Sequence, residues 1–260
     1  MIRPYRWLAP LFAAFALVAG PAAAEEPSPG PQYLMNLGIG GAVTPQYPGA
    51  DKYMFVPFPI IEAGRFFLPG LGQTVAKTRG IFLYPSFNLY GQRSPSDDKS
   101  LKGTKEIDWA LEAGIGGGFR TERFRVFATA RQGFNGYSGQ TGEIGADVIL
   151  PMSRRFEVLF GPRTSWASDG YMETYFGVTQ KEASRNSMLT AYKPEAGFKT
   201  AGLAATANYW LDERTRLQVR GSWNRLIGDA GDSPIVKYGS RDQWFAGIGI
   251  SRKLEFNLFR

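Results

Sequence analysis

Hydrophobic and polar positions alternate with a period of two along most of the chain, and the clearest case covers residues 107–119. One set of alternating positions is apolar or small: Ile107, Trp109, Leu111, Ala113, Ile115, Gly117 and Phe119. The intervening set is small or charged: Asp108, Ala110, Glu112, Gly114, Gly116 and Gly118. Because successive side chains of a β-strand point to opposite faces, this pattern predicts a strand with one apolar face.

The alternation recurs in other segments, each roughly 10 residues long, which is the length that a tilted membrane-spanning strand requires. The predicted strands cover residues 33–40, 53–61, 81–89, 107–119, 124–130, 144–150, 156–166, 197–211, 217–223 and 244–254. No linker or change of composition divides them. We therefore predict an all-β fold, a single antiparallel transmembrane β-barrel of about 10–12 strands.

Short turns constrain the topology of this barrel. Three of them lie near Thr121-Glu122, Ser153-Arg154 and Asp212-Glu213, and short turns of such barrels face the periplasm. Two turns on one side enclose an even number of strands, so residues 168–193 are predicted to be an external loop, with folding into the lumen left open. The same parity argues against residues 65–69 as a full strand, and omitting both segments leaves about 10 strands.

The first residues are typical of a secretory signal peptide. Arg3 and Arg6 form a basic end, residues 7–19 an apolar stretch, and Ala22-Ala23-Ala24 a small-residue cleavage site. The apolar stretch is too short for a spanning helix. We predict cleavage after Ala24, a flexible periplasmic lead-in over residues 25–32, and an outer-membrane barrel over residues 33–260 of a Gram-negative cell.

Composition narrows the chemistry. The chain has no cysteine and no histidine, which excludes disulfides, thiolate sites, catalytic triads and imidazole acid–base chemistry. We predict no catalytic residue, no cofactor and no metal. The formal charge is +7, or +5 without Arg3 and Arg6, and it is spread along the chain. Scattered arginines of an exported barrel suit lipopolysaccharide phosphates or anionic solutes better than nucleic acid.

Several charged residues are predicted to face the lumen: Asp108, Glu112, Arg125, Arg131, Arg163 and Arg220. Asp108 and Glu112 share one strand face and could be imagined as a glycosidase pair. The favoured interpretation is that they face Arg125 and Arg131 on the neighbouring strand as charge pairs.

Two further groups of charged residues favour an ordinary interpretation. Asp229 and Asp232 flank a glycine, but a calcium loop needs six to eight oxygens, so we favour a turn whose aspartates bond their own backbone. Asp97 and Asp98 with Lys99 and Lys102 are interpreted as a solvated external loop rather than a contact for lipopolysaccharide or divalent ions.

Three motifs resemble the MipA/OmpV family of outer-membrane proteins. They are Pro45, Tyr47, Pro48 and Gly49; Tyr175, Phe176, Gly177 and Val178; and Asp229 followed by Asp232, Ser233 and Pro234. The resemblance implies an outer-membrane barrel. It also implies scaffolding, in which the barrel links a lytic transglycosylase to a penicillin-binding protein in peptidoglycan synthesis. Other members are regarded as porin-like or adhesin-like.

The leading hypothesis is therefore a non-enzymatic scaffold in contact with outer-membrane lipid and lipopolysaccharide. The alternative is a narrow porin-like channel for small, preferentially anionic solutes, with Arg125, Arg131, Arg163 and Arg220 in its lumen. A lipid-modifying enzyme is disfavoured by the missing histidine. A soluble lipocalin-like barrel would leave a wide apolar belt in water, comprising Trp109, Leu111, Ile115, Phe119, Phe124 and Val126.

Overall fold

A computed structural model describes residues 33–68, 72–75 and 80–257. The predicted signal segment and lead-in lie outside the described residues. Within the described ranges, no helix combines the length and the apolar character needed to cross a membrane.

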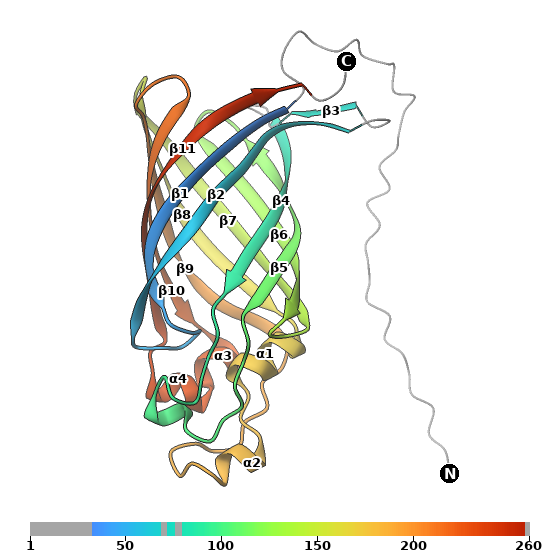
Figure 1. Ribbon diagram of the computed structural model, residues 1–260, viewed down its shortest axis with the longest axis vertical. Helices are drawn as coiled ribbons and strands as arrows, with labels where there is room; N and C mark the ends of the chain where they lie inside the picture. Colours follow the sequence, from blue (N-terminus) through green and yellow to red (C-terminus); the bar gives the residue numbers. More distant parts are fainter. Residues whose placement is uncertain (1–32, 69–71, 76–79, 258–260) are drawn as a thin grey trace, which may run out of the picture. The chain divides into compact units, whose positions relative to one another are not determined.

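The strands form one antiparallel sheet in the order β3-β2-β1-β11-β10-β9-β8-β7-β6-β5-β4 (Figure 1). Their bounds are β1 Tyr33–Pro45, β2 Tyr53–Leu68, β3 Gly72–Val75, β4 Gly80–Tyr90, β5 Ala110–Arg120, β6 Phe124–Asn135, β7 Gly139–Ser153, β8 Phe156–Ala167, β9 Gly197–Trp210, β10 Thr215–Leu226 and β11 Asp242–Phe256. The first and last long strands, β1 and β11, pair with each other, and β2 also contacts β4. The predicted all-β barrel is confirmed.

The short strand β3 differs from the others. It has 4 residues and pairs only with Arg65–Leu68 at the end of β2, whereas the remaining strands have 11 to 16 residues. Residues 65–68 are thus the end of a long strand, and the predicted loop segment around residue 171 is helical. Within the part of the chain that the structure describes, ten strands are therefore long enough to span, which is the even number that the turn parity predicted.

The outer wall carries the apolar set. Leu111, Ile115 and Phe119 of β5 are exposed, as are Phe124 and Val126 of β6, in register across the shared ladder. Trp109 is also exposed, although it precedes β5. The pattern misplaces Ile107 of the apolar set, which is buried and forms an isolated bridge with Arg93 because the chain leaves the sheet before Ala110. An apolar wall of this extent matches a lipid environment.

The two ends of the barrel differ in construction (Figure 1). Residues 121–123, 154–155 and 211–214 make short turns at one end. The opposite end carries longer connections that contain η1 Lys99–Leu101, α1 Asp169–Phe176, α2 Gln180–Ala183, α3 Gly228–Asp232 and α4 Pro234–Tyr238. We call these connections the cap. Because barrels of this type keep short turns in the periplasm, we expect the capped end to face the outside.

Candidate functional site

A buried carboxylate anchors a polar network in the lumen. Glu112 of β5 is fully buried and lies 2.9 Å from the Nε of Arg131 on β6. Its two oxygens also accept hydrogen bonds from Tyr137, from Thr141 at 3.0 Å and from Asn88 at 3.2 Å. Four donors from three strands and one turn therefore neutralise and hold this one charge, which is how a buried carboxylate is tolerated.

A second network surrounds Asp147 of β7. Arg125 reaches it through Nε at 2.9 Å, and Arg163 of β8 reaches it at 2.5 Å. Both guanidinium groups lie 5.0 Å from the centre of the Phe127 ring. Two arginines, one aspartate and one aromatic ring thus form a compact unit on the lumen wall, and the arginines are already committed to a partner within the protein.

These positions correct one predicted pairing. Glu112 does face Arg131, but Arg125 pairs with Asp147 instead of Asp108. Asp108 precedes β5 and is exposed, because the strand begins at Ala110. The imagined glycosidase pair of Asp108 and Glu112 is therefore not assembled. Asp147 carried a usable signal, since it falls between Ala146 and Val148 in the alternation of residues 144–150.

The remaining predicted lumen residue, Arg220, lies on β10 in the same alternating set as Gln218. Gln218 is buried and donates to Asn208 of β9 at 2.8 Å, and Asn208 donates to Glu157 of β8 at 3.1 Å. Hydrogen bonds therefore link the lumen faces of three adjacent strands. This side of the lumen is built from amides as well as charges.

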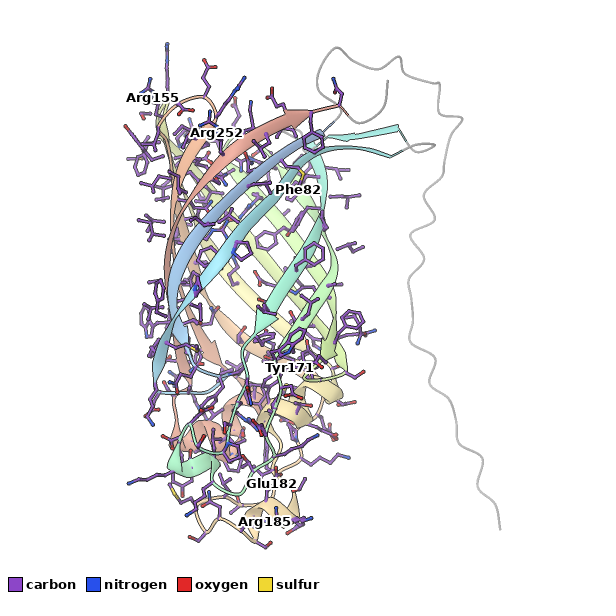
Figure 2. All side chains as sticks on the ribbon, in the orientation of Figure 1. Phe82, Arg155, Tyr171, Glu182, Arg185 and Arg252 are labelled. Carbon is purple, nitrogen blue, oxygen red and sulfur yellow. The ribbon has the colours of Figure 1, made fainter. Side chains whose placement is uncertain are left out.

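Packed aromatic rings lie where the cap meets the ends of the strands (Figure 2). Tyr171 and Tyr175 of α1 are almost completely buried, and their ring centres are 4.6 Å apart. Tyr137 lies 5.0 Å from Tyr171, and Tyr90 at the end of β4 lies 5.7 Å from Tyr175. Figure 2 shows Tyr171 where the barrel meets the cap. The predicted external loop is thus folded, and its helix α1 packs against the strand ends. We call α1, α3 and α4, together with residues 45–49 that pack on them, the lid.

Two cationic groups hold this lid, one from strand β9 and one from the connection between β4 and β5. The Nζ of Lys199 on β9 is buried and lies 4.9 Å from the centre of the Tyr171 ring. Arg93 is buried beside the cap, donates to the carbonyl oxygen of Tyr175 at 2.8 Å, and has a pKa lowered by burial to about 10. Burial also raises the pKa of Tyr175 to about 12, so both tyrosines of α1 remain neutral at physiological pH.

The three sequence motifs meet inside the cap, although they are far apart in the chain. Tyr47, Val178 and Ile235 share one buried apolar cluster. Phe176 belongs to a second cluster together with Val236. Ser233 is fully buried, and its hydroxyl donates to the carbonyl oxygen of Phe176 at 2.7 Å. The motif residues therefore build the lid rather than a reactive centre.

Backbone geometry accounts for the glycine and prolines of these motifs. Gly49 has a φ of +95°, and a Cβ there would lie 2.7 Å from Val236. Its carbonyl oxygen accepts from Ser240, and its N–H donates to Gln243. Pro45 ends β1, Pro48 follows Tyr47 in the turn, Pro234 begins α4, and Gly177 ends α1. These residues place the loop ends where the lid can pack.

The two motif aspartates have structural partners. Asp229 accepts from the backbone N–H of Glu195 at 2.8 Å, and Asp232 pairs with Arg241 at 2.7 Å. They belong to the short helix α3 and bond other segments, not their own turn as predicted, because the cap folds residues 195 and 241 beside them. Among the described residues, no group of three or more histidine, cysteine, aspartate or glutamate side chains could hold a metal ion.

The short turns at the opposite end are fixed by bonds to their own backbone. The hydroxyl of Thr121 accepts from Phe124 at 3.0 Å, Ser153 accepts from Arg155 at 3.2 Å, and Asp212 accepts from Arg214 at 2.7 Å. Arg123, Arg154 and Arg155 are exposed there, and their guanidinium groups form no hydrogen bond or ion pair with another described residue. The turns are thus held by internal hydrogen bonds, and the guanidinium groups of their exposed arginines have no partner among the described residues.

A family model described as MltA-interacting protein MipA matches residues 37–254, which run from β1 to β11 and include the whole cap. The chain belongs to the MipA family. The motif residues that resemble the family lie within the matched range, and they build the lid of this MipA-family barrel.

Solved membrane barrels resemble this MipA-family chain at low sequence identity. A de novo designed transmembrane β-barrel is 11% identical, with 86% of this chain and 97% of that chain covered and a TM-score of 0.31. The outer-membrane protein OprD of Pseudomonas aeruginosa is 10% identical, with 68% and 48% covered and a TM-score of 0.32. Neisserial surface protein A is 9% identical, with 86% and 97% covered and a TM-score of 0.27. No curated protein sequence matches the chain.

Proposed function

We propose that this MipA-family barrel is a non-enzymatic scaffold of the outer membrane, exported with a cleaved signal peptide, that links peptidoglycan-remodelling and peptidoglycan-synthesising enzymes. The observation that carries the proposal is the lid. Tyr90, Tyr137, Tyr171 and Tyr175 pack together where the cap meets the strand ends, and we infer that these rings obstruct the passage of a solute through the lumen. The two ends of the barrel, not its interior, are then its working surfaces.

The short-turn end suits a partner in the periplasm. Its turns are held by their own side chains. Arg123, Arg154 and Arg155 are exposed, and no other described residue binds their guanidinium groups, so they can meet carboxylates of another protein. Binding of ordered groups avoids part of the entropy that flexible loops lose on association. The family description names an interaction with MltA, and a lytic transglycosylase of that kind is the partner we propose. A penicillin-binding protein is the second proposed partner.

Charge reversal at the short turns tests this proposal. Immobilised full-length protein in detergent is titrated with the MltA-type lytic transglycosylase of the same organism. We expect binding, and we expect the triple variant Arg123→Glu/Arg154→Glu/Arg155→Glu to weaken it tenfold or more. The control variant Arg185→Glu/Lys193→Glu/Lys237→Glu changes the same number of charges in the cap and should bind within twofold of the parent. Absence of binding, or equal loss in both variants, would refute the scaffold.

The alternative function is a narrow channel for small anionic solutes. It is favoured by the basic side chains on the lumen strands, Arg125, Arg131, Arg163 and Arg220. Against it stand the lid and the ion pairs that already occupy three of these arginines. Planar-bilayer conductance discriminates the two functions. Conductance by the intact protein would support the channel, whereas silence of both the intact protein and a variant lacking residues 168–193 would eliminate it.

A further inference from the structure

The outermost part of the cap is made by two segments that are distant in sequence. One contains η1 and residues up to 105, and the other contains α2 and residues up to 186. The side-chain amide of Asn186 donates to the carbonyl oxygens of Ser100 and Lys102, each at 3.0 Å. A single buried side chain thus clamps the turn of the first segment onto the second.

Two further contacts fix the same junction. Gly103 has a φ of +85°, and a Cβ there would lie 2.9 Å from the Cβ of Arg185. The backbone N–H of Lys105 donates to the Glu182 carboxylate at 2.7 Å. Leu101 is fully buried beneath the turn. The backbone of both segments is therefore held in place, while the side chains that point away from the cap remain free.

The free side chains on this junction are cations. We call Lys99, Lys102, Lys105, Lys181 and Arg185 the basic tip. All are exposed, and their charged groups form no hydrogen bond or ion pair with another described residue. Figure 2 shows Arg185 together with Glu182 at the end of the molecule farthest from Arg155.

The acidic side chains near the basic tip are occupied. Glu182 closes a capping box with Thr179 and also accepts from Lys105. Asp98 pairs with Lys52 at 2.8 Å, and Glu106 accepts from Gln92. Within the described residues, none of these carboxylates forms an ion pair with the cations of the basic tip, and the tip therefore presents five exposed positive charges that are free of direct ion partners there.

We propose that the basic tip binds a polyanionic polysaccharide that approaches the cell from outside. A sulfated or phosphorylated sugar chain carries repeated negative groups, and several clamped cations can contact such groups at once. The tip lies on the outermost helix and turn of the cap, beyond the strand ends where lipid phosphates would gather (Figure 1). Each exposed contact is weak and is screened by salt, so affinity depends on several of them acting together.

Heparin serves as the probe, and the full-length protein in a non-ionic detergent is titrated with it. The variant Lys102→Gln/Lys181→Gln removes two charges from the tip. The matched control Lys193→Gln/Lys237→Gln removes two charges from the cap outside the tip. We expect the tip variant to weaken heparin binding at least tenfold and the control to change it less than twofold, with binding of the parent falling steeply as salt is raised. Unchanged heat-modifiable mobility on gels confirms that both variants are folded.

Three results would overturn the proposal. The first is no heparin binding by the parent protein at low salt. The second is equal loss in the two variants, which would indicate attraction by net charge alone. The third is tip-dependent binding of deep-rough lipopolysaccharide without binding of heparin, which would assign the tip to phosphates anchored in the membrane. Heparin binding that depends on the tip and exceeds binding of that lipopolysaccharide supports the proposal.

Discussion

The hydroxyl of Ser233 donates a hydrogen bond of 2.7 Å to the carbonyl oxygen of Phe176, the last residue of α1. The same hydroxyl oxygen accepts from the N–H of Ile235 in the first turn of α4 at 3.2 Å. One buried side chain thus satisfies backbone groups of two helices that are separated by 57 residues in sequence. It joins the second and third family motifs at the centre of the lid.

Replacing Ser233 with alanine should loosen the lid. The carbonyl oxygen of Phe176 would be buried without its donor, which costs about 1–3 kcal/mol. Hydrogen exchange followed by mass spectrometry should then show residues 171–178 and 230–238 exchanging about 5- to 100-fold faster, from the same energies. Ser184→Ala is the control, because its hydroxyl bonds an exposed backbone carbonyl of Lys181. Equal exchange in the parent and Ser233→Ala would contradict the assigned role.

Gly49 should tolerate alanine poorly. Its φ of +95° is costly for a residue with a Cβ, by about 1–3 kcal/mol, and the added atom would press against Val236. Thermal unfolding, followed by loss of heat-modifiable mobility, should occur at a lower temperature for Gly49→Ala. Gly91→Ala is the matched control, since a Cβ at Gly91 meets nothing within 4 Å. Unfolding of the two variants at the same temperature would contradict the requirement for glycine at position 49.

Removing the Glu112 carboxylate should destabilise the barrel strongly. Glu112→Leu would leave the partly buried Arg131 in the lumen without its ion partner, and the loss of one member of a buried pair typically costs about 3–5 kcal/mol. Urea unfolding from lipid vesicles measures this loss. The double variant Glu112→Leu/Arg131→Leu should recover a large part of it, and Glu143→Gln should have a small effect because that carboxylate is 4.0 Å from Arg163 and partly exposed. A silent Glu112→Leu would contradict the buried network.

The pair of Lys52 and Asp98 predicts a pH dependence in the cap. The Lys52 ammonium and the N–H of Ser100 lower the pKa of Asp98 to about 2, from its ordinary value of 3.8. Because the folded pKa is lowered, the stabilisation from this pair is complete above pH 4 and is lost as the pH falls toward 2.

The pKa of Asp98 can be measured directly by carboxyl carbon NMR in micelles. Lys52→Gln should move it upward toward 3.8, since the strongest of its stabilising contacts is removed. Lys193→Gln, which removes a cation that pairs with Glu173, serves as the control and should leave the Asp98 titration unchanged. An Asp98 pKa that is the same with and without Lys52 would show that the ammonium does not hold it.

The barrel could be predicted from the sequence because the period of two is visible within the residues of each strand alone. The alternation at Leu111, Ile115 and Phe119 can be seen without knowledge of distant residues. Two short turns on the same side of the membrane enclose an even number of strands, which limits the strand count. Asp108 shows the limit of this reasoning, since it continues the alternation but lies before the strand. A period of two says which face a side chain takes and not where the ladder of hydrogen bonds ends.

The lid could not be predicted in the same way. Its helices are short, α1 having 8 residues and α2 having 4, and their apolar residues follow no extended period. The contact of Ser233 with Phe176 depends on the fold of two separate loops, so no local pattern signals it. The resemblance to a family singled out both Ser233 and Phe176, but it contained no information on whether the two residues are in contact.

Crosslinking in intact cells tests the scaffold most directly. A photo-reactive amino acid is placed at position 154 in a short turn, or at position 185 in the cap, and the tagged barrel is purified after irradiation. If the barrel is a scaffold, we predict recovery of a lytic transglycosylase or a penicillin-binding protein from position 154 and of neither from position 185. Recovery of the barrel alone from position 154, or of the same enzymes from both positions, would contradict it.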